Sequence, residues 1–188
     1  MKPPYSLALL TDPPTWRGTA LSGRPLDLLA VLAASPQTRV SDDILIEALW
    51  PDDVPARPLR ALHVVVSRVR AVVGEGVVER LGDGYRLALP AAQIDVCDLA
   101  DRAERARTRA VEGQWDQVLV LTGSLPQVPA HCEAGDAVGA GPAPLSRLRE
   151  RAVALAEAAR CDRGLALEAT GEHERAAELL REAAQRDA

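Results

Sequence analysis

Apolar residues recur every three or four positions between residues 58 and 73, which predicts an amphipathic helix. Its buried stripe is expected to contain Leu59, Leu62, Val66, Val69 and Val73. Pro58 suits the first position of this helix, because a backbone N–H would have no partner there. At 100° per residue, the opposite face carries Arg60, Val64, Ser67, Arg68 and Ala71, with His63 and Arg70 on its flank. The pattern therefore predicts one buried side and one side that is small, polar and cationic.

A shorter helix is predicted just before it, from Asp42 to Trp50. Ser41 is a suitable N-cap, because its hydroxyl can accept from an unpaired amide of the first turn. Asp42 and Asp43 favour the positive end of the helix dipole. Pro51 ends the helix, and residues 52–55 form a polar turn before the second helix begins. Two helices in this order are typical of a helix-turn-helix.

Short strands are predicted on both sides of the helix pair. Residues 77–80 and 85–89 flank a turn at 81–84, and Asp83-Gly84 is a common hairpin pair. Upstream, short strands are expected at 6–10, 15–17 and 19–21, followed by an apolar helix from about Pro25 to Ala34. Strands, three helices and a hairpin predict an α+β winged helix-turn-helix over residues 1–90.

Residues 91–188 have the pattern of an all-α domain. A helix from Asp98 to Glu112 is followed by Gly113 and a second helix from Gln114 to Leu121. A further pair is predicted at 144–169 and 172–186, separated by Gly171. The similar spacing after the two glycines suggests a helical repeat. Because stacked pairs usually need three units to bury a continuous core, we expect a truncated or minimal version of such a domain.

The segment between these pairs, residues 122–143, is rich in Gly, Pro and small residues and is expected to be a mobile loop. It lacks the Gly-Lys-Ser/Thr ending of a phosphate-binding loop. His131 and Cys132 have no second close pair of ligands, so we predict no metal and no cofactor. Trp50 and Trp115 lie on apolar helix faces and are expected to anchor cores rather than stack on bases.

The net charge of −5 belongs to the second half of the chain. Residues 1–90 hold ten basic and ten acidic groups, whereas residues 91–188 hold twelve basic and seventeen acidic groups. Residues 57–70 contain four arginines and no acidic residue, so a neutral domain can still present a positive face. A single copy should bind a polyanion weakly, and two linked copies on repeated sites would recover affinity.

Cysteine usage and hydropathy indicate a cytoplasmic protein with no membrane association. The three cysteines, Cys97, Cys132 and Cys161, are widely spaced and form no disulfide framework. No secretory signal and no apolar run of membrane-spanning length is visible.

Three motifs in the first half resemble one family. LIEALWPDD at 45–53, LHVVVSRVRAVVG at 62–74 and GYRL at 84–87 are similar to the Streptomyces antibiotic regulatory proteins. Those proteins resemble response regulators with a winged helix of the OmpR and PhoB type. Gln93-Ile94-Asp95-Val96, followed by a helix, is similar to the opening of the bacterial transcriptional activator domain, a tetratricopeptide-like helical module.

The resemblance implies a sequence-specific transcriptional activator of a secondary-metabolite, or antibiotic, biosynthetic cluster. In the family, the third helix enters the major groove, and the hairpin lies over the neighbouring backbone or minor groove. Members bind tandem promoter repeats and contact RNA polymerase. The implied partners are therefore double-stranded promoter DNA, RNA polymerase and a second copy of the chain.

Carried over by position, the groove-facing residues are Arg60, His63, Val64, Ser67 and Arg68, and Arg70 would contact the DNA backbone. Arg80 is the candidate from the hairpin. The related regulators usually place an arginine where Leu81 stands here, and a shift of one residue in a strand reverses the side-chain face. Arg60 stands where the family commonly has Asn, which would alter the preferred sequence.

Two other functions are alternatives to DNA binding. The helical repeats could bind a partner protein while the winged helix no longer contacts DNA, and the acidic second half would suit that role. An enzyme is not predicted, because no combination of side chains forms a recognisable catalytic arrangement. The arginines on the outer face of the helix at 58–73 separate the first two possibilities.

Overall fold

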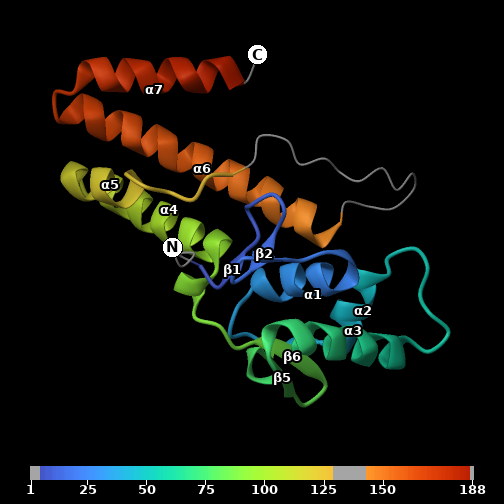
Figure 1. Ribbon diagram of the computed structural model, residues 1–188. Coiled ribbons are helices and arrows are strands. Elements are labelled where there is room, and N and C mark those ends of the chain that lie inside the picture. Colours follow the sequence, from blue (N-terminus) through green and yellow to red (C-terminus); the bar gives the residue numbers. More distant parts are fainter. Residues whose placement is uncertain (1–4, 129–142, 187–188) are drawn as a thin grey trace. The chain divides into compact units, whose positions relative to one another are not determined.

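The computed structural model describes residues 5–128 and 143–186 and divides into two compact units (Figure 1). The first unit contains residues 5–97 and 143–150, and the second contains residues 98–128 and 151–186. The first unit thus includes residues beyond the expected boundary at 90, and this difference has a physical basis described below. Each unit is described by itself.

The first unit contains two three-stranded antiparallel sheets. One has the order β1 (Leu7–Ala8), β2 (Thr15–Trp16) and β3 (Thr19–Ala20). The other has the order β4 (Val40–Ser41), β6 (Gly84–Leu87) and β5 (Val78–Leu81). The upstream strands and the hairpin confirm the predicted order. β4 was not predicted, because two residues are too few to show an alternating pattern.

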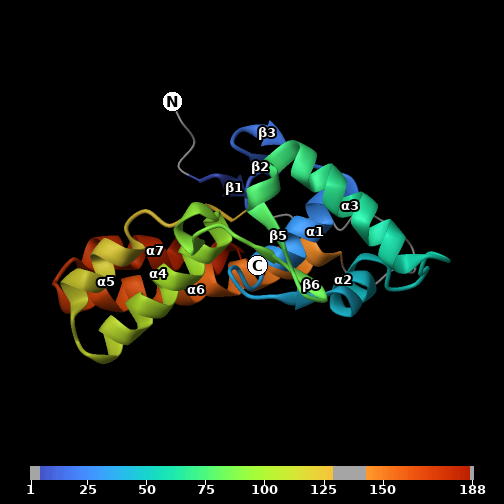
Figure 2. The same cartoon turned by 90° about the horizontal axis from the view of Figure 1, so that it is seen from below.

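Three helices complete the predicted winged helix. They are α1 (Gly23–Ala33), α2 (Asp42–Leu49) and α3 (Pro58–Val73), and β5 follows the end of α3 (Figure 2). The Ser41 hydroxyl accepts from the Ile44 N–H at 3.4 Å, as an N-cap does. The predicted stripe of α3 is wrong at one position: Leu59 is 52% exposed, and Val65 is buried instead. Leu59 lies in the first turn, at the edge of the buried arc.

The hairpin turn differs by one residue from the prediction. Leu81 pairs with Gly84, so the turn residues are Gly82, with φ of 56°, and Asp83. Gly84 lies in β6 rather than in the turn, directly against β4. A Cβ atom at Gly84 would overlap the Val40 carbonyl oxygen and lie 2.9 Å from the Ser41 Cα atom. The close approach of two strands, rather than turn geometry, requires glycine here.

Two buried charged residues from later in the chain close the first unit. Asp95, which begins α4 (Asp95–Val111), accepts from the backbone N–H groups of Leu9 at 2.9 Å and Leu10 at 2.7 Å. Arg149, in α6 (Pro144–Ala169), donates to the carbonyl oxygens of Leu9 at 2.9 Å and Thr11 at 2.6 Å. These contacts explain why the unit extends beyond residue 90.

The second unit is helical, as predicted. α5 (Trp115–Thr122) follows α4, and α7 (His173–Arg186) follows α6. Gly113 and Gly171, at the two breaks, have positive φ values of 71° and 83°. Ala106, Val118 and Ala166 form a buried cluster, and the half-buried Trp115 packs against it, which fits its predicted role as a core anchor.

Polar contacts join the helices of the second unit. Arg107 of α4 pairs with the buried Asp162 of α6 at 2.9 Å. Arg102 donates to the Leu121 carbonyl oxygen at 3.0 Å, which ties α4 to α5. None of the helices in the described part of the chain is long and apolar enough to cross a membrane. Of the predicted mobile loop, residues 129–142, with His131 and Cys132, lie outside the described residues.

Candidate nucleic-acid interface

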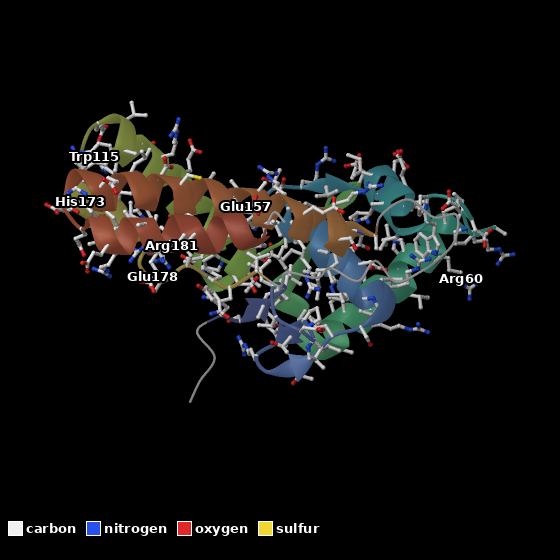
Figure 3. All side chains as sticks on the ribbon, turned by 90° about the horizontal axis from the view of Figure 1, so that it is seen from above. Arg60, Trp115, Glu157, His173, Glu178 and Arg181 are labelled. Carbon is white, nitrogen blue, oxygen red and sulfur yellow. The ribbon has the colours of Figure 1, made fainter. Side chains whose placement is uncertain are left out.

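The outer face of α3 is exposed along its length. Arg60, His63, Val64, Ser67 and Arg68 are all exposed, and Val64 is 46% accessible. In Figure 3, Arg60 lies at the outer surface of the first unit. Burial of Leu62, Val66 and Val69 on the opposite side fixes this orientation, because their packing leaves the cationic side to solvent.

The nine arginines of residues 5–97 fall into two groups. Six have partners: Arg17 on the Trp16 ring, Arg24 with Asp27, Arg39 with Asp83, Arg70 with Val78, Arg80 with Asp42 and Arg86 with Glu79. Within residues 5–97, only the side chains of Arg57, Arg60 and Arg68 make no such contact. Arg57 is the N-cap residue of α3, and all three are exposed. The arginines of residues 5–97 that remain free to bind an anion are therefore concentrated on one helix.

Arg57 was not among the predicted contacts. It lies three residues before Arg60, on the same side of the helix, so the helical spacing carried the signal. Arg57 stands just before the predicted start of the helix at Pro58, and the structure makes it the N-cap residue of α3.

An open groove of about 620 Å³ lies between α3 and the hairpin. Its lining includes His63, Ser67 and Arg70 from α3, Arg80 and Tyr85 from the hairpin, and Glu75 from the connecting turn. The structure thus brings four predicted contact residues, His63, Ser67, Arg70 and Arg80, to one groove. Arg60, Val64 and Arg68 are not part of its lining.

Arg70 holds the hairpin against α3. Its Nε atom donates to the Val78 carbonyl oxygen at 2.9 Å, and its guanidinium carbon lies 5.8 Å from the centre of the Tyr85 ring. Tyr85 is 4% exposed, and its contact with Arg70 joins the hairpin to the helix. The Arg70 contact with a DNA backbone remains a prediction, and its contacts within the protein already give it a structural role.

Arg80 points toward α2. Its Nη1 and Nη2 atoms donate to the two carboxylate oxygens of Asp42 at 2.7 and 2.8 Å. Its guanidinium carbon lies 4.6 Å from the centre of the Tyr85 ring. Hydrogen bonding to Asp42 raises the pKa of Arg80 further above its usual value. A paired arginine of this kind differs from the free arginines of α3.

Within residues 5–128 and 143–186, no group of three or more His, Cys, Asp or Glu side chains is placed to hold a metal ion. The site is a surface of cations, short polar groups and one valine. Such a surface can bind phosphates and contact base edges.

Comparison with known proteins agrees with this geometry. Residues 17–87 match the family described as "Transcriptional regulatory protein, C terminal". The chain is 32% identical over 100 residues to Regulatory protein AfsR of Streptomyces griseus, and 34% identical over 101 residues to that of Streptomyces coelicolor. These matches cover 49% and 50% of this chain but 10% of each relative, so the chain spans only a small part of their length.

A solved structure shares the fold. Mycobacterium tuberculosis EmbR, in complex with a low affinity phosphopeptide, has a TM-score of 0.65 and 24% sequence identity. The similarity covers 95% of this chain and 48% of the other, so both the winged helix and the helical region have counterparts there. The chain therefore has a winged helix of the OmpR and PhoB type over residues 17–87, and about half of the chain is similar to Regulatory protein AfsR.

Proposed function

We propose that this chain binds promoter DNA in the cytoplasm through α3 and activates transcription of a secondary-metabolite gene cluster. The observation that carries the DNA-binding part is the clustering of Arg57, Arg60 and Arg68 on one exposed helix face. The first 90 residues have no net charge, so this local concentration supplies the attraction for phosphates. The activating role and the type of target genes follow the resemblance to the Streptomyces antibiotic regulatory proteins.

In this proposal α3 lies in the major groove. Arg60 and Arg68 fork onto guanine edges or phosphates, Val64 contacts a thymine methyl group, and Ser67 lets the backbone approach closely. His63 and Arg70 line the protein groove beside the hairpin, and from there they face the neighbouring DNA strand. The helical unit links two copies on tandem repeats or contacts RNA polymerase, which compensates for weak binding by one copy.

Binding to a selected duplex tests the proposal. The full chain is used to select duplexes from a random-sequence library, and the best is titrated at several salt concentrations. The affinity should fall as salt rises, because arginines near phosphates release counterions. Arg60→Ala should weaken binding to the selected duplex by roughly 1–3 kcal/mol if Arg60 forks onto a base.

Arg151→Ala is a matched control. Arg151 is also exposed, belongs to the helical unit and makes no side-chain hydrogen bond or ion pair within the described chain. Its removal should leave the affinity nearly unchanged. Failure of the folded wild-type chain to retain any duplex would contradict the proposal and favour a protein-interaction module.

A further inference from the structure

The Arg80–Asp42 pair uses most of the hydrogen-bonding capacity of Arg80. Besides the two bonds to the Asp42 carboxylate, the Nε atom donates to the Gly82 carbonyl oxygen at 2.9 Å. An arginine has five N–H donors, so two remain. The stacking on Tyr85 also holds the guanidinium plane in place.

The pair also changes the charge that DNA would meet at the hairpin. Asp42 is 8% exposed and its carboxylate lies directly beside the guanidinium, so the two formal charges cancel. A phosphate approaching Arg80 would be repelled by Asp42 at nearly the same distance. Arg68, which is exposed and has no such partner, presents its full positive charge.

The same pair lies where the hairpin meets the helix-turn-helix. The Asp42 backbone N–H donates to the Asp83 carbonyl oxygen at 2.8 Å, and Ser41 pairs with Gly84. On the other strand, Arg70 ties Val78 to α3. The hairpin is thus held at its turn by the start of α2 and at its base by the end of α3.

We propose that Arg80 is a positioning residue and not a DNA contact. With Asp42 and Tyr85 it fixes the hairpin so that the hairpin and the arginines of α3 meet the duplex together. This inference rests on the proposed function.

Asp42→Asn distinguishes a phosphate contact by Arg80 from a positioning role, because the two roles predict opposite changes in DNA affinity. If Arg80 contacted a phosphate, removing the competing carboxylate would free it, and DNA binding would become tighter and more salt-dependent. If Arg80 positions the hairpin, binding to the selected duplex becomes severalfold weaker. The slope of log affinity against log salt then stays the same, because no phosphate contact is gained or lost. Hydroxyl-radical footprinting should show protection lost only at one edge of the site.

Arg80→Gln and Arg68→Gln form a matched pair of full-chain variants. Arg68→Gln should lower the salt slope by about 0.9, the value for one phosphate contact. Arg80→Gln should leave the slope unchanged and weaken binding severalfold. Arg80→Lys keeps the charge but cannot form the fork, so it should restore only part of the affinity. If Arg80→Gln reduced the salt slope as much as Arg68→Gln does, the proposal would be overturned.

Hydrogen exchange in the absence of DNA keeps this test independent of the proposed function. Exchange of the backbone amides at 81–84 should accelerate in Arg80→Gln and Asp42→Asn and stay unchanged in Arg68→Gln. Circular dichroism confirms that each variant is folded at the chosen temperature. Unchanged exchange in a folded Arg80→Gln would contradict the positioning role, whether or not the wild-type chain binds DNA.

Discussion

The Arg149 guanidinium donates to the Leu9 carbonyl oxygen at 2.9 Å, across 140 positions of the sequence. The same short segment donates two backbone N–H groups to Asp95. A carboxylate and a guanidinium, both buried, therefore hold the chain that follows β1. The winged-helix unit is complete only with these two residues, which lie outside the family match at residues 17–87.

Arg149→Ala should destabilise the first unit by about 1–3 kcal/mol, because two backbone oxygens lose their donor. Arg147→Ala is the control, since Arg147 is exposed and its side chain makes no hydrogen bond or ion pair within the described chain. Urea unfolding is followed by the fluorescence of Trp16 and Trp50 in a Trp115→Phe background, which reports on this unit alone. Equal midpoints for the two variants would show that Arg149 contributes nothing to stability.

The contribution of Asp95 to stability should depend on pH. Burial raises the pKa of Asp95 above 3.8, although the N–H groups of Leu9, Leu10 and Val96, and then Arg149, oppose the shift. The protonated form is therefore favoured more in the folded state than in the unfolded state. The contribution is fully present below pH 3.8 and is lost as pH rises through the higher folded pKa.

Asp95→Asn isolates this dependence. The free energy of unfolding of the wild type, minus that of Asp95→Asn, should increase as pH is lowered from 7 toward 4. Urea titrations at several pH values measure it. A difference that decreases over this range would mean that the hydrogen bonds and Arg149 outweigh burial, and that the pKa is lowered.

Gly84→Ala should destabilise the first unit by about 1–3 kcal/mol, because the new methyl group meets the backbone of β4. Gly76→Ala is a matched control: Gly76 does not have a positive φ, and a Cβ atom there would meet no atom within 4 Å. Its effect should stay within about 0.5 kcal/mol. Thermal melts measure the loss of stability in both variants. Similar losses would contradict the close approach of β4 and β6.

Cys97 should react slowly with thiol reagents. Its Sγ atom lies 3.3 Å from the Ala33 carbonyl oxygen, and burial, followed by the Asp95 charge, raises its pKa to about 11. About one thiol in a thousand is then ionised at pH 8. Alkylation with iodoacetamide and peptide mapping should find the exposed Cys161 labelled before Cys97. In urea, Cys97 and Cys161 should react at similar rates. Equal rates in the native protein would show that the environment of Cys97 does not protect its thiol.

Local patterns were sufficient to predict the helices and the winged-helix order. The apolar spacing and Pro58 predicted α3, and Ser41 with Asp42 and Asp43 predicted the start of α2. Gly113 and Gly171 marked the helix breaks. These features act within a few residues, because helix geometry repeats every 3.6 residues and capping involves the first turn. The sequence alone therefore determined which face of α3 is exposed.

Only the tertiary structure decided which charged side chains are paired. Arg80 and Arg68 look equivalent in the sequence, yet Arg80 meets Asp42, 38 positions away, whereas Arg68 meets no partner within the described chain. The sequence predicts Gly84 in the turn, whereas the register of β4 and β6 places it in a strand. Ion pairs and close backbone contacts depend on which elements pack together, and that information is not contained in the spacing of residues along one element.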